Sequence, residues 1–280
     1  MELRPQSLND LTDILNPKKE SSSMSMLSAV SRNSVAKPRR LGIYGGSGVG
    51  KTTFASQFPN PILIDVEGGA DDLDVAKTPR CTRLETVTQV LLELSDPNIE
   101  HGFETVIVDS MDWYENLIMR DMHDRNFNTD YGRGAIEEAR LFSNLIKQLD
   151  LCRDRGMSVV MIAHSSIRSI QDTNGNTFTR TEPKLSKRNT ALWLEYCDEV
   201  GLARQKVFFS EANGGFDKNR KIARTVGEVE LVFAPNPQHA SKKRLAGLPD
   251  QVNLHNFGDY AQYVPYLQGQ QPLTENKGTV

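Results

Sequence analysis

GGSGVGKTT, at residues 45–53, is the stretch that decides the fold of this chain. It consists of Gly45, Gly46, Ser47, Gly48, Val49, Gly50, Lys51, Thr52 and Thr53. From Gly45 to Thr52 it satisfies G-x-x-x-x-G-K-[ST], the pattern of a phosphate-binding loop. The apolar run before it predicts a β-strand, and the residues after it predict a helix. This is the context that such a loop requires.

The residue types of this loop explain why it predicts a nucleotide site. Glycines let backbone N–H groups turn inward around phosphates, and the start of the following helix adds a favourable field. Lys51 is long enough to reach the β- and γ-phosphates, and the Thr52 hydroxyl is a suitable Mg²⁺ ligand. The loop therefore predicts binding of ATP and Mg²⁺, but it leaves open what the nucleotide is used for.

The composition argues against several classes of protein. The chain has 280 residues, of which 38% are hydrophobic, enough for one sizeable α/β core with extensions. With a net charge of −3, any nucleic-acid-binding surface has to be local. The three cysteines are far apart, which argues against a disulfide framework or a zinc site. Because no apolar run is long enough to span a membrane and the start does not resemble a signal peptide, we expect a cytoplasmic protein with no membrane partner.

Apolar strands alternate with helical segments along the chain, which predicts an α/β fold. Four runs have the length and composition of buried strands: 40–44, 62–66, 105–109 and 158–163. Four segments between them have helical spacing: 51–58, 84–94, 113–126 and 135–155. Continuously apolar strands separated by helices indicate a mainly parallel sheet with helices on both faces.

The pattern changes after residue 196. Short apolar runs separated by turns follow at 200–203, 206–209, 221–223 and 229–233. We expect them to add strands at one edge of the sheet, partly antiparallel, with a hairpin turn at Asn213-Gly214-Gly215.

Three parts of the chain differ in composition. Residues 1–37 are serine-rich and predict a flexible N-terminal arm, whose apolar patch at 8–15 is either disordered or docks on a neighbouring subunit. Residues 38–268 form the predicted core, and residues 269–280 a loose polar tail.

Candidate catalytic residues lie at the carboxyl ends of the predicted strands. Asp109 ends the third strand, where it can hold Mg²⁺ through water. Asp65 and Glu67 follow the second strand and project to the same side. Glu67, at the glycine turn, is the candidate base for the attacking water, the alternative being a solvated acidic loop. His164 ends the fourth strand, where it either contacts the γ-phosphate or its water or is a hydrogen-bonded strand-end histidine.

The order of these motifs resembles the RecA-type ATPase core. A phosphate loop is followed by a strand with glutamate (IDVEGG), a strand with VIVDS, a strand ending in MIAHS, and edge strands. More closely, RLGIYGGSGVGKTTFASQFPNPILIDVEGG with the later AHS and KKRLAGLP resembles phage-encoded RecA-like nucleotide-binding proteins, over about residues 38–250. The chain does not resemble AAA+ ATPases or small G proteins. It has no N/TKxD motif, and its glutamate does not adjoin the magnesium aspartate.

The resemblance implies roles for individual residues. Glu67 matches the catalytic glutamate of the family, and His164 matches the polar sensor that couples the γ-phosphate to a DNA-binding loop. RecA has glutamine at the sensor position, whereas related ring helicases and clock-type ATPases often have histidine.

Two segments, 126–134 and 165–188, fall where the family has mobile DNA-binding loops. The residues in them that suit backbone charge contacts and base stacking are Tyr131, Arg133, Arg168, Arg180, Lys184, Lys187 and Arg188. The alternative is an ordinary solvated insertion.

The segment Lys242-Lys243-Arg244 resembles the K-x-R segment that RecA-like assemblies insert into the ATP site of the next subunit. Lys242 and Arg244 would then stabilise phosphoryl charge in trans. The alternative is a solvated basic turn.

Together these features predict a Mg²⁺-dependent ATPase with a RecA-like core, stimulated by single-stranded DNA. It would act as a homo-oligomer, a ring or a filament, in phage recombination or annealing, with a phage single-strand-binding protein as a further partner. Two other functions stay open: a P-loop small-molecule kinase, and a nucleotide-gated accessory module of phage replication or packaging.

Overall fold

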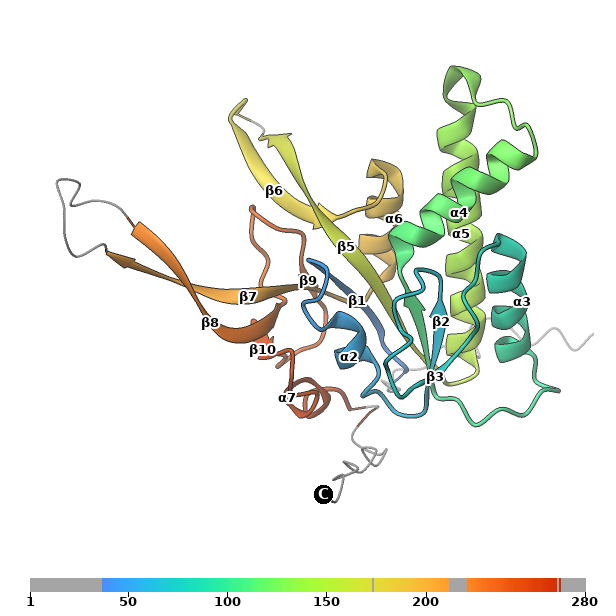
Figure 1. Ribbon diagram of the computed structural model, residues 1–280, viewed down its shortest axis with the longest axis horizontal. Helices are drawn as coiled ribbons and strands as arrows, with labels where there is room; N and C mark the ends of the chain where they lie inside the picture. The colour runs from blue at the N-terminus through green and yellow to red at the C-terminus, as the bar shows by residue number, and fades with distance from the viewer. Residues whose placement is uncertain (1–36, 173, 212–220, 266, 268–280) are drawn as a thin grey trace, which may run out of the picture. The chain divides into compact units, whose positions relative to one another are not determined.

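The structure of the protein is a computed structural model that describes residues 37–172, 174–211, 221–265 and 267 (Figure 1). These residues belong to one compact unit, Ala36–Val280. The predicted arm up to residue 36, the predicted tail and the turn at Asn213-Gly214-Gly215 lie outside the described residues.

A twisted sheet forms the centre of the described structure. Its parallel strands are β1 (Arg40–Gly45), β2 (Pro61–Asp65), β3 (Ala76–Lys77), β4 (Thr105–Asp109), β5 (Ser158–Gln171) and β7 (Glu199–Glu211). Antiparallel strands join it as β6 (Thr177–Pro183), β8 (Lys221–Val232), β9 (Lys242–Lys243) and β10 (Gln251–Asn253). The strand order is β10-β8-β7-β1-β5-β4-β2-β3, with β6 paired to β5 and β9 to β7.

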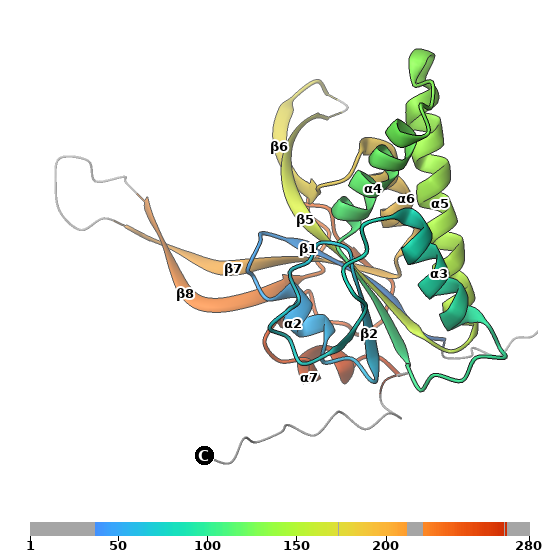
Figure 2. The same ribbon diagram turned by 45° about the vertical axis from the view of Figure 1, so that its right-hand side comes forward.

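Helices cover both faces of this sheet (Figure 2). The described helices are α2 (Lys51–Ala55), α3 (Leu84–Ser95), α4 (Met111–Asp124), the 3-10 turn η2 (Asp130–Gly132), α5 (Arg133–Asp154), α6 (Lys187–Tyr196) and α7 (Gly258–Ala261). None of them is long and apolar enough to cross a membrane.

Alternate residues of each strand enter two separate hydrophobic cores. On β4, Val106 and Val108 point to the core under α3, α4, α5 and α6, whereas Ile107 points to the core under α2 and α7. Because successive side chains of a strand project to opposite faces, a strand that is buried on both faces reads as continuously apolar. The predicted α/β fold with a mainly parallel sheet, helices on both faces and extra edge strands is therefore confirmed.

The strand order determines which loops meet at the carboxyl edge of the sheet. β5 lies between β1 and β4, and β2 lies next to β4. The phosphate loop after β1, the turn after β2, and the ends of β4 and the buried part of β5 are therefore neighbours, because parallel strands end at the same edge.

The structure corrects four sequence-based expectations. The fourth strand does not end at Ala163: β5 continues to Gln171 and pairs with β6, and α6 begins at Lys187. The predicted flexible segment 165–188 is thus mostly a β-hairpin, in which residues 165–171 of β5 pair with residues 177–183 of β6 and Ile170 lies opposite Phe178.

The runs at 200–203 and 206–209 are also not separate strands but parts of β7, joined across an irregularity between Gln205 and Val207. β8 contains 221–223 and most of 229–233, and it pairs antiparallel with β7, as a hairpin at 213–215 would require. The helix predicted at 51–58 ends earlier, at Ala55.

Candidate functional site

The phosphate loop connects β1 to α2 and folds around the side chain of Lys51. Gly48 and Gly50 have φ angles of +70° and +98°, which glycine adopts without strain. The Lys51 ammonium donates hydrogen bonds to the carbonyl oxygens of Gly45 at 3.2 Å and Gly46 at 2.7 Å. Burial lowers the pKa of Lys51. The loop thus holds a buried cation at its centre, as phosphate binding requires.

Thr52 and Asp109 form the second part of the site. The Thr52 hydroxyl donates to Oδ2 of Asp109 at 2.6 Å, although β4 is separated from β1 by β5. Asp109 is 8% exposed, and burial raises its pKa to about 6, against the opposing effect of the Thr52 hydrogen bond.

These two oxygen ligands fit Mg²⁺. It is typically bound by one or two protein oxygens, with water and substrate phosphates completing its coordination. In the described part of the chain no group of three or more His, Cys, Asp or Glu side chains could form a metal cage. A site that shares the ion with phosphates is therefore the arrangement that the residues support.

The turn after β2 fixes the position of Glu67. The backbone N–H groups of Val66 and Glu67 donate to the carbonyl oxygen of Asp109 at 2.7 and 3.1 Å. The Asp65 carboxylate is buried and accepts from the N–H of Gly68 at 2.6 Å. Asp65 therefore shapes the turn, whereas the Glu67 side chain is 29% exposed and lines the cavity of the phosphate loop.

His164 lies opposite Glu67 and has a partner that sequence reasoning missed. Its Nε2 is 3.7 Å from Oε1 of Glu67, and its Nδ1 is 3.0 Å from Oδ2 of Asp112. Asp112 also accepts from the backbone N–H of His164 at 3.0 Å, and it is 4% exposed. The sequence feature that pointed to Asp112 was its position in the first turn of α4, three residues after Asp109.

One cavity of about 380 Å³ brings the predicted nucleotide and catalytic residues together. It is lined by Ser47, Gly48, Gly50, Lys51, Thr52, Thr53, Glu67, Gly69, Leu73, Asp109 and His164. The sequence had not indicated Gly69 or Leu73. Leu73 adds an apolar surface to an otherwise polar cavity.

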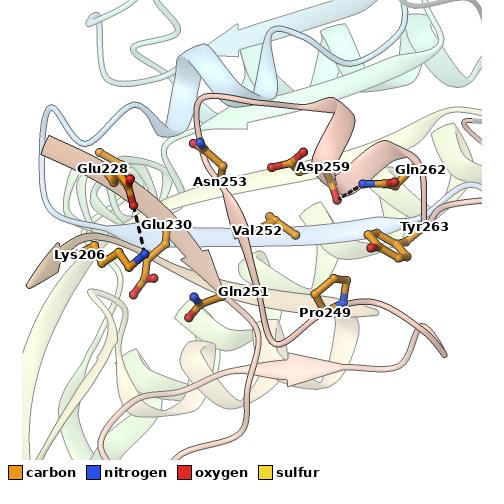
Figure 3. A pocket seen from close by; sticks show the side chains of 11 residues that line it. Lys206, Glu228, Glu230, Pro249, Gln251, Val252, Asn253, Asp259, Gln262 and Tyr263 are labelled. Atoms are coloured by element: carbon orange, nitrogen blue, oxygen red, sulfur yellow. Dashed lines mark hydrogen bonds and ion pairs between the residues drawn. The ribbon is translucent and has the colours of Figure 1, made fainter. Parts of the chain in front are cut away.

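A second hollow, of about 340 Å³, contains none of the predicted site residues (Figure 3). It lies between β8, β10 and α7, and its ends carry polar pairs. Lys206 bonds Glu228 at 3.1 Å, and Gln262 donates to the carbonyl oxygen of Asp259. Because these polar groups satisfy each other, we assign no ligand to it.

Lys242 and Arg244, the two residues predicted to act in trans, lie near the amino end of β7, away from the phosphate loop. Both contact groups of their own chain. The Lys242 ammonium donates to the carbonyl oxygens of Leu194, Glu195 and Cys197 at 2.7, 3.1 and 2.7 Å, at the C-terminal end of α6. Arg244 is 3.5 Å from Asp198, and its side chain is 51% exposed. Within one chain, therefore, neither residue belongs to the site, and Arg244 is the more accessible of the two.

The residues predicted to bind DNA divide into two groups. Arg168 and Arg180, on the β5–β6 hairpin, lie 3.7 and 3.6 Å from Glu182, and Arg168 also donates to the carbonyl oxygen of Leu185. The other residues are exposed: Tyr131, Arg133, Lys184, Lys187 and Arg188. Tyr131, in η2 between α4 and α5, is 99% exposed.

A family model described as an AAA domain matches residues 37–245 of the chain. The chain belongs to the AAA domain family. This is a family of nucleotide-binding P-loop ATPases, and the match covers the phosphate loop, Asp109 and His164. No curated protein matches the chain.

The family model is described as an AAA domain and not as AAA+, so the expectation that the chain does not resemble AAA+ ATPases stays a prediction. That expectation rested on the position of the glutamate, and the observation itself holds. Glu67 follows β2, and the residue after Asp109 is Ser110.

Replacing Asp112 by alanine is expected to lower the free energy of unfolding by about 2 kcal/mol, because it leaves buried donors of His164 without an acceptor. Urea denaturation measures this loss. The matched control is Asp121→Ala on the same helix, which removes an i,i+4 pair with Arg125 and should cost about 0.3–0.5 kcal/mol. Equal losses in the two variants would contradict this account of Asp112.

Proposed function

We propose that the protein is a Mg²⁺-dependent ATPase that binds single-stranded DNA and acts as an oligomer in phage recombination or annealing. The observation that carries the ATPase part is the convergence of Lys51, Thr52, Asp109, Glu67 and His164 on one cavity. The DNA part rests on the resemblance to phage RecA-like proteins and on the grouping of exposed basic residues described below.

In the proposed reaction, Lys51 and the loop N–H groups bind the phosphates, and Thr52 and Asp109 hold the Mg²⁺ ion. When bound, the ion neutralises phosphate charge. Glu67 accepts a proton from water as the water oxygen bonds to the γ-phosphorus. The bond from that phosphorus to the β–γ bridging oxygen breaks, and its electron pair leaves with ADP. His164, held by Asp112, orients Glu67 and contacts the γ-phosphate or its water.

A continuous strand connects this site with the proposed DNA-binding hairpin. His164 lies on β5 where the strand leaves the buried sheet, and the same strand continues through Arg168 to Gln171. A shift of β5 at His164 therefore displaces the base of the hairpin. This supports a coupling between the bound nucleotide and the DNA contact.

The exposed basic residues gather near the start of α5. Arg188 donates to the carbonyl oxygen of Ala135 at 3.3 Å, so the first turns of α6 and α5 are in contact. Lys184 and Lys187 are thereby brought to the same end as Arg133. In Figure 1 this end and the β5–β6 hairpin rise on the same side of the sheet. Such a grouping suits the phosphate backbone of a single strand, with Tyr131 available for base stacking.

Oligomerisation supplies the remaining part of the proposal. Arg244 lies at the opposite edge from the phosphate loop of its own chain, so it reaches an ATP site only in another copy. Lys242 could do so only by leaving three carbonyl oxygens. Of the two, we propose Arg244 as the residue that acts in trans.

The decisive experiment measures ATP turnover and assembly state with and without single-stranded DNA. We expect ADP and phosphate as products, faster turnover with DNA, and an oligomer with ATP and DNA. A protein that stays monomeric with unchanged turnover would exclude the DNA-linked function. A phosphorylated small molecule as product would instead indicate a kinase.

Replacing Lys184 and Lys187 together by alanine should weaken single-strand binding at every sequence and lower its salt dependence. Each lost phosphate contact reduces the slope of log affinity against log salt by about 0.7. Fluorescence anisotropy over a salt series measures both effects. Lys147→Ala is the control, since Lys147 is exposed on α5 about 21 Å along the helix from Arg133. An unchanged slope in the double variant would place the DNA elsewhere.

A further inference from the structure

Arg80 lies in the segment between β3 and α3 and contacts two parts of the site. Its guanidinium lies over the ring of Trp113, 5.5 Å from the centroid. Its Cδ and Nε would be 2.9 Å from a Cβ on Gly68, so the arginine stem lies directly on the turn that follows Glu67. The side chain is exposed, and no ion pair or hydrogen bond from its guanidinium is present among the described residues.

The contacts of Arg80 link Trp113 on α4 to the turn that carries Glu67. On one side, the Glu67 carboxylate is 3.7 Å from His164, whose Nδ1 is 3.0 Å from Asp112. Trp113 follows Asp112 in the first turn of α4, and Arg80 joins Trp113 to the turn at Gly68. The end of β2 is therefore held both through its carboxylate and through its backbone.

Beyond the hydrogen bond from its N–H to Asp65, Gly68 is a point at which this turn gains from a further contact. Its φ angle is +89°, a conformation in which glycine has more freedom than any other residue. Two glycines follow Glu67, so the chain beyond the glutamate has little stiffness of its own. A planar cation stacked on an aromatic ring can add a restraint to those of the backbone hydrogen bonds at residues 66–68.

We propose that Arg80, stacked on Trp113, is a positioning residue that holds the Gly68 turn and so orients Glu67 for its role as base. This inference rests on the proposed function, in which Glu67 accepts the proton of the attacking water. Arg80 itself contacts neither nucleotide nor water in this scheme. It acts on turnover through the geometry of Glu67, where an error of about 1 Å can cost roughly a hundredfold in rate.

The first test is kinetic and uses the full chain. Arg80→Ala should lower kcat for ATP by about tenfold or more, and KM and mant-ATP affinity should stay within about twofold, because the phosphate contacts are intact. Trp113→Ala should behave in the same way, while Trp113→Phe, which keeps a ring, should retain most of the rate. The control is Arg83→Ala, an exposed arginine three residues away, which should match the wild type.

The double variant Glu67→Gln/Arg80→Ala separates the two proposals. If Arg80 acts through Glu67, its removal causes no further loss of rate in the Glu67→Gln background. A further loss of rate in the double variant would show that Arg80 acts independently of Glu67. A wild-type rate in Arg80→Ala beside an inactive Glu67→Gln would show that Arg80 has no role in turnover. Either result overturns the inference while leaving Glu67 as the proposed base. If Glu67→Gln alone keeps the wild-type rate, the proposed base itself fails.

A spectroscopic measurement tests the contact without any turnover. The chain has two tryptophans, and Trp193 is fully buried, so Trp193→Phe leaves Trp113 as the only tryptophan, whose fluorescence is excited selectively at wavelengths that tyrosine does not absorb. In this background Arg80→Ala should increase acrylamide quenching of Trp113, because one ring face loses its cover, whereas Arg83→Ala should not. Equal quenching in both variants would overturn the proposed contact.

Discussion

The Glu67→Gln protein is expected to bind ATP with wild-type affinity and to hydrolyse it at least about a hundredfold more slowly, since the amide cannot accept the proton of the attacking water. The change keeps the size of the side chain. It also leaves in place the backbone bonds that tie residue 67 to Asp109. The loss should therefore appear in kcat and not in nucleotide affinity.

Single-turnover hydrolysis and mant-ATP titration measure the two quantities separately. The matched control is Asp71→Asn, a nearby exposed carboxylate that does not line the phosphate-loop cavity, which should hydrolyse ATP normally. Wild-type hydrolysis by Glu67→Gln would remove the glutamate from the mechanism. Weakened ATP binding at an unchanged rate of hydrolysis would show instead that Glu67 contributes to nucleotide binding and not to the chemical step.

Gly45→Ala should destabilise the fold by about 3 kcal/mol, because the new methyl group has no space. A Cβ at this position would be 2.2 Å from the carbonyl oxygen of Ala203 on β7, which pairs with β1 at that residue. Since the obstructing atom belongs to the backbone, no side-chain rotation relieves the overlap. β1 and β7 would have to separate where the phosphate loop begins.

The neighbouring glycine provides the control. A Cβ on Gly46 would have no heavy atom within 4 Å, so Gly46→Ala should leave the free energy of unfolding near the wild-type value. Urea denaturation without nucleotide compares the two proteins. Equal stability of both variants would show that β1 and β7 are not packed as described.

These predictions differ in how far the sequence could have supplied them. The phosphate loop, Asp109 and Glu67 were recognisable because each requires a particular residue type next to a predicted strand end. Asp112 and Arg80 were not, because an aspartate in the first turn of a helix and an arginine before one are common features of helical proteins. Their roles appear only when α4, β2 and β5 are placed side by side.

The segment 165–188 is a case in which the sequence predicted the wrong local structure. Its polar composition predicted a flexible loop, whereas β5 and β6 form a hairpin whose paired strands are each too polar to be recognised alone. Lys242 is similar: a basic run predicted a residue that reaches into the next subunit, whereas its ammonium binds three carbonyl oxygens at the C-terminal end of α6. Local composition does not determine which partners the rest of the chain supplies.

By itself, the sequence determined the α/β class, the phosphate loop and the carboxylates at the strand ends, because continuously apolar strand-length runs and glycine-rich turns are local properties of the chain. Only the tertiary structure decided that Glu67 faces His164, that Asp112 orients His164, and that Arg80 covers the turn after Glu67. These contacts join segments far apart in the chain. They form only because the parallel strands β2, β4 and β5 end at one edge of the sheet.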